Sequence, residues 1–322
     1  MKKKILILLF LILAIPTALF KFYSIKVAEK KDYNIQVNLK QGMSLNSVFN
    51  KLGIEDSLIF KIFLKYEKNS GKNIKAGFYE FNGKYSYADI LQMMEEGKVK
   101  YTILTIPEGY SIKEIGKLLQ DRGIGTEDGL KKALANIKDF PYLTPNGNFE
   151  GYLYPETYYL SVDTNETEIV KAMTKEFIKR FPPEQYPDKK RFYEQLIMAS
   201  IIEREAQLKE EKPLMASVFY NRLKKGMNLG SDATVNYAYD YSKRRMYYKD
   251  LKIDSPYNTY MYKGLPPAPI SNPDYNSVMA ALKPANTDYL FFVVTSNGKH
   301  TFTKTYKEHL EIQKKSKNWL GE

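Results

Sequence analysis

A glutamate in an apolar helical stretch is the feature of this sequence that most suggests catalysis. Residues 195–206 read QLIMASIIEREA, and Glu205 follows an apolar stripe formed three, four and seven positions earlier by Ile202, Ile201 and Met198. Side chains at these spacings share one face of a helix. Burial on such a face disfavours the charged carboxylate and raises its pKa, which a general acid requires near neutral pH. Glu205 is therefore the candidate proton donor.

The pattern leaves one alternative open for Glu205. The predicted helix spans roughly residues 191–208, and it could emerge into solvent at this point, which would leave the carboxylate merely exposed. Glu203 lies about 200° away around the helix axis, so the two glutamates cannot act side by side as a dyad. Arg204, between them, could pair with neighbours on either side.

The composition excludes several other chemistries. The sequence contains no cysteine and only two histidines, His300 and His309. Disulfides, thiolate nucleophiles and cysteine–zinc sites are therefore excluded, and a multi-histidine metal site is not expected. No cofactor or metal is predicted, so catalysis would depend on carboxylates, hydroxyls or lysines.

The charge of the chain indicates an anionic partner. Lys and Arg number 49 against 37 Asp and Glu, which gives a net charge of +12. Such a surplus suits an anionic membrane, an acidic cell-wall polymer or a nucleic acid. The lysines are scattered and no nucleic-acid-binding motif is present, so a nucleic acid is the least favoured of these partners.

The N-terminus predicts a membrane anchor. Three lysines at positions 2–4 precede a mainly apolar run over residues 5–23. This length suits a spanning helix, with residues 1–23 as an uncleaved anchor and 24–32 as a polar tether. A cleaved signal peptide is the alternative, although its best cleavage site is poor. Either way the rest of the chain is expected outside the cytoplasm, and the anchor would make it a single-pass protein of the cell membrane.

An internal repeat organises the first half of the chain. Residues 36–54 (QVNLKQGMSLNSVFNKLGI) and 104–124 (LTIPEGYSIKEIGKLLQDRGI) both predict a strand, a Gly-x-Ser turn, a helix and a closing Gly-Ile. From Asn146 the sequence is rich in turn residues until the helix that carries Glu205. Helices and strands are mixed without a regular βαβ order, so we expect an α+β fold. Further helices are predicted at 87–97, 213–225 and 306–319, and further strands at 76–81 and 289–294.

Seven stretches of the chain resemble the endolytic murein transglycosylases, the MltG or YceG-like family. They are TIPEGYS (105–111), EGYLYPETY (150–158), ASIIEREA (199–206), VFYNRLKKGMNLGSDATVNYA (218–238), YNTYMYKGLPPAPISNP (257–273), AALKPANTDYLFFVV (280–294) and GKHTF (298–302). The resemblance implies a lysin-motif-like module, which the repeat places at 33–145. It also implies a catalytic domain at 146–322 that is distantly similar to lysozyme-type transglycosylases.

The resemblance implies an endolytic lytic transglycosylase in which Glu205 is the single general acid and base. Such an enzyme cleaves between N-acetylmuramic acid and N-acetylglucosamine within nascent peptidoglycan strands and leaves 1,6-anhydro ends. Peptidoglycan strands are then the substrate, and peptidoglycan synthases are candidate partners near the membrane. A hydrolytic muramidase, or a non-catalytic membrane scaffold that binds peptidoglycan, remains the alternative.

The motifs also suggest residues that line a substrate cleft. A structural hydrogen-bonding role is an equally good interpretation for each of them. One departure from the family concerns Gly230, because much of the family carries Gln before the Ser/Thr-Asp pair that is Ser231-Asp232 here. The candidate substrate-binding residues are Glu156, Tyr158, Asn221, Asp232, Tyr257, Asn258 and Tyr260.

Overall fold

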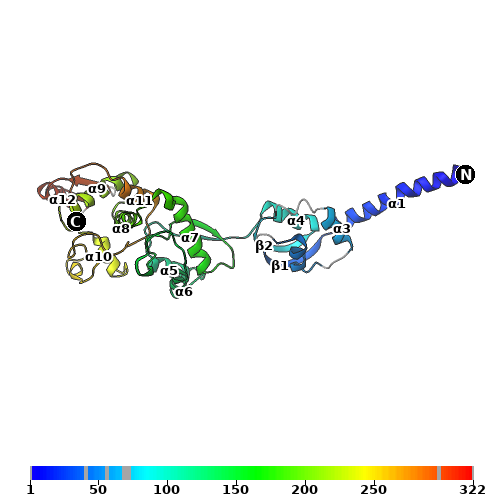
Figure 1. The fold of residues 1–322 in the computed structure, drawn as a ribbon, viewed down its shortest axis with the longest axis horizontal. Coiled ribbons are helices and arrows are strands. Elements are labelled where there is room, and N and C mark those ends of the chain that lie inside the picture. The colour runs from blue at the N-terminus through cyan, green and yellow to red at the C-terminus, as the bar shows by residue number, and fades with distance from the viewer. Residues whose placement is uncertain (1, 40–42, 55–57, 67–73, 296–298, 321–322) are drawn as a thin grey trace. The chain divides into compact units, whose positions relative to one another are not determined.

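The protein is an α+β protein whose chain divides into two compact units (Figure 1). The computed structural model describes residues 2–39, 43–54, 58–66, 74–295 and 299–320. Unit 1 contains residues 1–102 and 159–163, and unit 2 contains the remainder. Within the described residues, helices are combined with three two-stranded sheets, which confirms the predicted fold class.

Unit 1 is built on an antiparallel pair of strands that are separated in the sequence by two of the described helices. β1 (Lys31–Leu39) pairs with β2 (Gly77–Tyr85), and Val37 lies opposite Tyr79. The helices that accompany the pair are α2 (Leu45–Lys51), α3 (Leu58–Tyr66) and α4 (Tyr87–Glu96). The buried side chains of these strands and helices form a largely aromatic core that contains Phe49, Phe60, Phe63, Tyr79, Phe81 and Tyr87.

The N-terminal helix α1 (Lys2–Ala28) precedes β1. Within the described part of the chain, no helix is both long and apolar enough to cross a membrane. The side chains of residues 2–13 lie outside the described set, so the anchor over residues 1–23 stays a prediction. The segment predicted as a tether, 24–32, is helical up to Ala28 and extended from Lys31.

The two copies of the sequence repeat share their local structure, although each lies in a different unit. Ser44 and Ser111 each cap a helix by accepting a hydrogen bond of 3.2 Å from the amide three positions later. Both helices end before a glycine with positive φ, Gly53 at 67° and Gly123 at 66°. The isoleucine after each glycine bonds back to the helix at 3.1 Å. Gly42, in the first predicted turn, lies outside the described residues.

Unit 2 is organised around α8 (Lys189–Glu205), which packs against α9 (Lys212–Lys224), α10 (Asp232–Ala238) and α11 (Tyr275–Leu282) (Figure 1). Every side chain of α8 from Leu196 to Ile202 is buried. A helix that is apolar on all sides must be covered on all sides. This requirement explains why three helices gather around α8.

The remaining elements of unit 2 flank this bundle. α5 (Ile112–Asp121) packs on α6 (Glu127–Ala135), and α6 packs on α7 (Glu166–Arg180). Helix α7 lies in the segment after Asn146 that was expected to be rich in turns, so the sequence analysis missed this helix. Two short sheets are also present. β3 (Thr102–Thr105) pairs with β4 (Thr157–Leu160), and the residues of these strands are divided between the two units. β5 (Phe291–Val294) pairs with β6 (His300–Thr303) in unit 2, and α12 (Tyr306–Leu320) packs on this sheet.

Many tyrosines of unit 2 belong to the core. The ring centroids of Tyr142 and Phe192 lie 4.9 Å apart, and those of Tyr152 and Phe177 lie 5.1 Å apart. The Tyr152 hydroxyl donates to the Leu143 carbonyl at 2.6 Å. A buried tyrosine hydroxyl requires such a partner. The high tyrosine content is therefore partly a packing feature and is not by itself a sign of sugar binding.

We expect Gly151 to be intolerant of a side chain. Its φ is 90°, and a Cβ there would lie 2.9 Å from Pro269 and 3.1 Å from Leu196. Gly151→Ala should lower the free energy of unfolding by about 2–5 kcal/mol, through backbone strain and overpacking together. The control is Gly147→Ala, where φ is 70° but nothing lies within 4 Å. That variant should lose only about 1–2 kcal/mol in urea unfolding. Equal losses would contradict the packing argument.

Candidate functional site

Glu205 is the last residue of α8, and its side chain is held at the start of α10. The Ser231 hydroxyl donates a hydrogen bond of 2.5 Å to Glu205 Oε1. The backbone amide of Ala233 also acts on this carboxyl group and favours its charged form. Ser231 is the N-cap residue of α10, but its side chain makes no capping bond within that helix. The Glu205 carboxyl therefore lies at the first turn of α10, where a capping side chain would normally interact with the free amides.

The pKa of Glu205 is raised, mainly by burial of its carboxyl group. The negative charge of Asp232 acts in the same direction, whereas the hydrogen bond from Ser231, the Ala233 amide and the proximity of His300 act in the opposite direction. The residue as a whole nevertheless keeps part of its surface accessible to solvent. A desolvated acid that remains reachable from outside suits proton donation to a substrate.

The end of α8 differs from the sequence prediction. The helix stops at Glu205, and Ala206 is extended with φ −102° and ψ 113°. The predicted end at Leu208 was therefore three residues too late. The apolar stripe itself is as predicted, because Met198, Ile201 and Ile202 are fully buried. The helix does end at Glu205, as the alternative supposed, but the residue is not merely exposed, because its carboxyl turns towards α10.

Three further side chains surround the Glu205 carboxyl. The Tyr260 hydroxyl donates to Asp232 Oδ1 at 2.7 Å, and both residues interact electrostatically with Glu205. Arg222 also interacts with Glu205, while its Nε donates to the Leu290 carbonyl at 2.7 Å. Burial lowers the pKa of Arg222, although the Glu205 charge opposes this effect. Two predicted residues, Asp232 and Tyr260, are thus brought to Glu205.

Gly230, where much of the family carries Gln, lies beside this group. Its φ is 57°, in the left-handed region. A Cβ at this position would lie 3.5 Å from the Tyr260 ring and 3.9 Å from the Arg222 guanidinium. These are ordinary van der Waals distances, so the space would admit a side chain. The backbone conformation rather than crowding favours glycine here.

Glu203 belongs to a buried ion-pair cluster. Lys212 Nζ lies 3.1 Å from Glu203 and 2.8 Å from Asp274, and the Asp274 amide donates to Glu203 at 2.8 Å. Burial raises the pKa of Glu203, and the Lys212 charge opposes this rise. For Asp274, hydrogen bonds from Lys212 and Asn276 outweigh burial and lower the pKa to about 2. Removing one member of such a cluster costs about 3–5 kcal/mol, so Glu203 is a structural residue.

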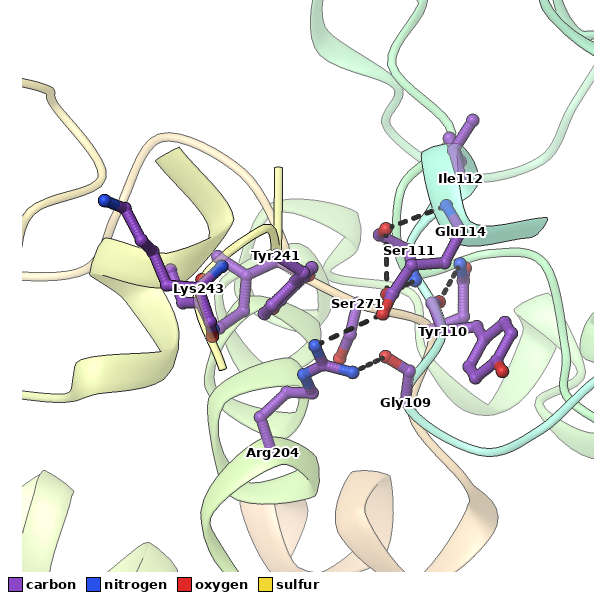
Figure 2. Close-up of polar contacts among 12 residues, drawn as sticks. Gly109, Tyr110, Ser111, Ile112, Glu114, Arg204, Tyr241, Lys243 and Ser271 are labelled. Atoms are coloured by element: carbon purple, nitrogen blue, oxygen red, sulfur yellow. Dashed lines mark hydrogen bonds and ion pairs between the residues drawn. The ribbon is translucent and has the colours of Figure 1, made fainter. Parts of the chain in front are cut away.

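Arg204 connects α8 to two distant segments (Figure 2). Its guanidinium donates to the Gly109 carbonyl at 3.0 Å and lies 3.5 Å from a Glu114 carboxylate oxygen. The same guanidinium stacks on the Tyr241 ring, 3.5 Å from its centroid. Three consecutive residues at the end of α8 therefore belong to three separate networks. Glu203 is paired with a lysine, whereas the Glu205 carboxyl has no cation at hydrogen-bonding distance in the described structure.

Glu150 is a second buried carboxyl that the sequence analysis did not single out. It accepts hydrogen bonds from the Ile112 amide at 3.0 Å, the Asn272 side chain at 3.0 Å and the Tyr237 hydroxyl at 3.2 Å. Burial raises its pKa to about 8. These bonds join the EGYLYPETY motif to the first residue of α5, to the 218–238 motif through Tyr237 and to the 257–273 motif through Asn272, so Glu150 holds the framework of unit 2 together. Glu150 begins the EGYLYPETY motif, which was the available signal, but its burial could not be predicted because its partners come from distant positions in the sequence.

Three of the other candidate binding residues make structural contacts. Asn221 donates to the carbonyls of Thr287 and Tyr289 at 2.7 and 3.0 Å. Asn258 is fully buried and donates to two loop carbonyls at 2.8 and 2.9 Å. Tyr158 is buried, and its hydroxyl donates to a carbonyl four residues earlier.

Glu156 is exposed and pairs with Arg180 of α7 at 3.1 Å. The Tyr257 ring lies 4.8 Å from Tyr237, on the Glu150 side of α10. The described contacts of these five residues do not include Glu205. The structure therefore favours the structural interpretation for Asn221, Asn258 and Tyr158.

His300 and Glu211 form a partly buried pair near the site. His300 Nδ1 lies 2.7 Å from Glu211 Oε2, and the His300 amide donates to the other oxygen at 2.9 Å. Among the described residues, no group of three or more histidine or carboxylate side chains is arranged to hold a metal ion.

The chain belongs to the YceG-like family, whose sequence profile matches residues 37–315. A Bacillus subtilis (strain 168) protein named endolytic murein transglycosylase is 37% identical over 308 residues, which cover 87% of this chain and 84% of that relative. A protein with the same name from Streptococcus pneumoniae serotype 2 is 27% identical, covering 88% of this chain but 58% of that longer relative. The family membership that the motifs indicated is thereby confirmed.

A solved structure agrees with this assignment. The crystal structure of a YceG-like protein from Listeria monocytogenes is 36% identical in sequence and matches with a TM-score of 0.60. The match covers 88% of this chain and 100% of that one.

We expect Ser231→Ala to raise the pKa of Glu205 further, because the lost hydroxyl stabilises the carboxylate form. A ¹³C NMR titration of the glutamate side-chain carboxyls measures this pKa, and the Glu205 signal is assigned by its absence from Glu205→Gln. Ser231→Thr, which keeps the hydroxyl, is the matched control and should titrate like the parent chain. An unchanged or lowered pKa in Ser231→Ala would show that the 2.5 Å hydrogen bond does not stabilise the carboxylate.

Proposed function

We propose that this chain is an endolytic lytic transglycosylase of peptidoglycan and that Glu205 is its catalytic acid and base. Membership of the YceG-like family, and relatives named endolytic murein transglycosylase, support the reaction class. The observation that carries the assignment of Glu205 is its desolvated carboxyl at the end of a buried helix, in a residue that keeps part of its surface accessible to solvent.

The proposed reaction uses one carboxyl group twice. Protonated Glu205 donates its proton to the glycosidic oxygen between N-acetylmuramic acid and N-acetylglucosamine, and the bond from that oxygen to C1 breaks. The muramic acid ring becomes an oxocarbenium-like species. The Glu205 carboxylate then takes the proton of the C6 hydroxyl, and O6 bonds to C1. The products are a 1,6-anhydro end and a new N-acetylglucosamine end, with no water consumed.

The surroundings of Glu205 suit both halves of this cycle. Burial favours the protonated acid before cleavage. The Ser231 hydroxyl and the Ala233 amide stabilise the carboxylate that exists between the two proton transfers. A pKa raised by burial and restrained by two donors allows the group to release a proton and to recover one.

A hydrolytic muramidase is the second candidate, and Asp232 is the observation that favours it. This carboxylate is close enough to Glu205 to raise its pKa. Glycosidases that use water rely on a second carboxylate to activate it or to form a covalent intermediate. However, Asp232 already accepts the hydrogen bond from Tyr260. The chemical nature of the product ends distinguishes the two reactions.

We expect Glu205→Gln to reduce strand cleavage by at least about 100-fold, because the amide can neither donate nor accept the transferred proton. The measurement is mass spectrometry of products from uncrosslinked peptidoglycan strands. The parent chain should release 1,6-anhydro-N-acetylmuramic acid ends, and reducing ends would instead identify a hydrolase.

Two variants serve as controls for Glu205→Gln. Glu194→Gln changes an exposed residue of the same helix and should behave like the parent chain. Glu203→Gln should be less stable because it disturbs the pair with Lys212, yet its folded fraction should retain cleavage. Cleavage retained by Glu205→Gln would refute the assignment. A folded parent chain that cleaves no strand would favour the peptidoglycan-binding scaffold.

We also propose that residues 1–23 anchor the chain in the cell membrane, with both units outside the cytoplasm near peptidoglycan synthases. The basic residues at 2–4 and the apolar run after them support this orientation. A chain lacking residues 1–23 should fail to replace the full chain in cells while cleaving purified strands normally. Full replacement by the truncated chain, at equal abundance, would show that anchoring is not required.

A further inference from the structure

Two adjoining clefts in unit 2 lie outside the group of side chains around Glu205. They have volumes of about 640 and 390 Å³, and they share Lys113, Glu127, Asp240 and Tyr241 in their linings. One wall is α5 with the start of α6, and the other is the end of α10 with the turn after it. We refer to the two clefts together as the α5–α10 groove.

The α5–α10 groove carries charges of both signs. Lys113 and Lys117 of α5 and Lys131 of α6 supply positive charge. Asp121, Glu127 and Asp240 supply negative charge in the same lining, which also includes Glu114, paired with Arg204, and the buried Glu150. Tyr110, Tyr237 and Tyr239 contribute ring surface. A ligand that matches this lining carries carboxylate and amino groups, whereas a bare chain of N-acetylated sugars would leave the charges without partners.

The turn that forms one wall is strained. Asp240 and Tyr241 both have φ of 55°, and neither is a glycine. Two successive residues in this region cost free energy and persist only where other contacts hold them. Tyr241 is held by its hydroxyl bond to the Ile270 carbonyl at 2.7 Å and by its amide bond to Asn236 at 2.8 Å. Such strain is concentrated at binding sites and active sites.

Arg204 ties both walls of the groove to the catalytic helix. Figure 2 shows its guanidinium between the Tyr241 ring on one side and Glu114 of α5 on the other. The next residue of α8 is Glu205. The helix α10 makes a second connection, because Ser231 at its start binds Glu205 and Tyr237 near its end lines the groove. Its seven residues span only about 10 Å.

We propose that the α5–α10 groove binds the peptide stem of a peptidoglycan strand whose glycan backbone lies at Glu205. This inference rests on the proposed function. Uncrosslinked stems carry carboxylates and the free amine of a diamino acid, and the lysines and carboxylates of the groove are complementary to these groups. The groove would thus select strands that still carry their stems and would orient them for cleavage.

A weak ion pair occupies the groove in the described structure. Lys113 Nζ lies 2.6 Å from Asp240 Oδ2, and both side chains are more than half exposed. Exposed ion pairs contribute little to stability. Replacing this pair by a contact of Lys113 with a stem carboxylate and a contact of Asp240 with a stem amine therefore costs little free energy.

The test compares two ligands on the full chain carrying Glu205→Gln. The probes are soluble uncrosslinked glycan strands with stems, and the same strands after an amidase has removed the stems. Stem-bearing strands should bind about tenfold more tightly, the size expected for two solvent-exposed charge contacts. Adding Lys117→Ala and Asp121→Ala, both exposed and one helical turn apart on α5, should abolish the difference. Affinity for bare strands should stay unchanged.

The matched control adds Lys190→Ala and Glu194→Ala, an exposed pair with the same spacing on α8, and it should keep the tenfold preference. Equal binding of both strands by the parent, or a preference that survives Lys117→Ala with Asp121→Ala, overturns the inference and leaves the proposed function standing. Binding of neither strand overturns the proposed function and this inference together.

Discussion

The burial of α8 is the constraint on which the rest of unit 2 depends. Its residues from Leu196 to Ile202 are apolar or small on every side, so they require cover from every side. Helices α9, α10 and α11 provide that cover. The last turn of α8 then emerges among these helices with three charged residues in succession, and each must find its own partners. The geometry of the candidate site follows from where those partners lie.

The charged residues of this turn meet the cost of burial in different ways. Glu203 is neutralised by Lys212, which also binds Asp274. Arg204 is satisfied by a carbonyl, a carboxylate and an aromatic ring. The Glu205 carboxyl interacts with two neutral groups, the Ser231 hydroxyl and the Ala233 amide, and with the negative charge of Asp232. None of these neutralises it, so protonation is the simplest way to remove its charge. This difference in partners separates the candidate acid from its structural neighbours.

Features set by local sequence could be predicted, whereas features set by tertiary contacts could not. The apolar stripe beneath Glu205 and the capping serines Ser44 and Ser111 depend on spacings of a few residues. The bond from Ser231 to Glu205 joins positions 26 apart, and that from Asn272 to Glu150 joins positions 122 apart. No periodicity encodes such pairs.

The motif residues show a related limit. Asn258 and Tyr260 lie two positions apart in one stretch, yet Asn258 is fully buried with its amide on loop carbonyls, while Tyr260 is exposed beside the acid. A family-like motif draws attention to a residue without showing whether that residue contacts the substrate or holds a loop. The missed helix α7 is different, since its cap at Asn165 accepts two amide hydrogen bonds and was a local signal.

Glu205 also has a structural role, because α10 has no side-chain cap of its own. A helix of seven residues is too short to be stable by itself and depends on its ends and its packing. Its N-cap residue Ser231 is bound by the carboxyl of another helix, and that carboxyl also interacts with the Ala233 amide. The proposed chemistry and the folding of α10 thus share one side chain. Position 205 is constrained by the architecture of unit 2 as well as by proton transfer.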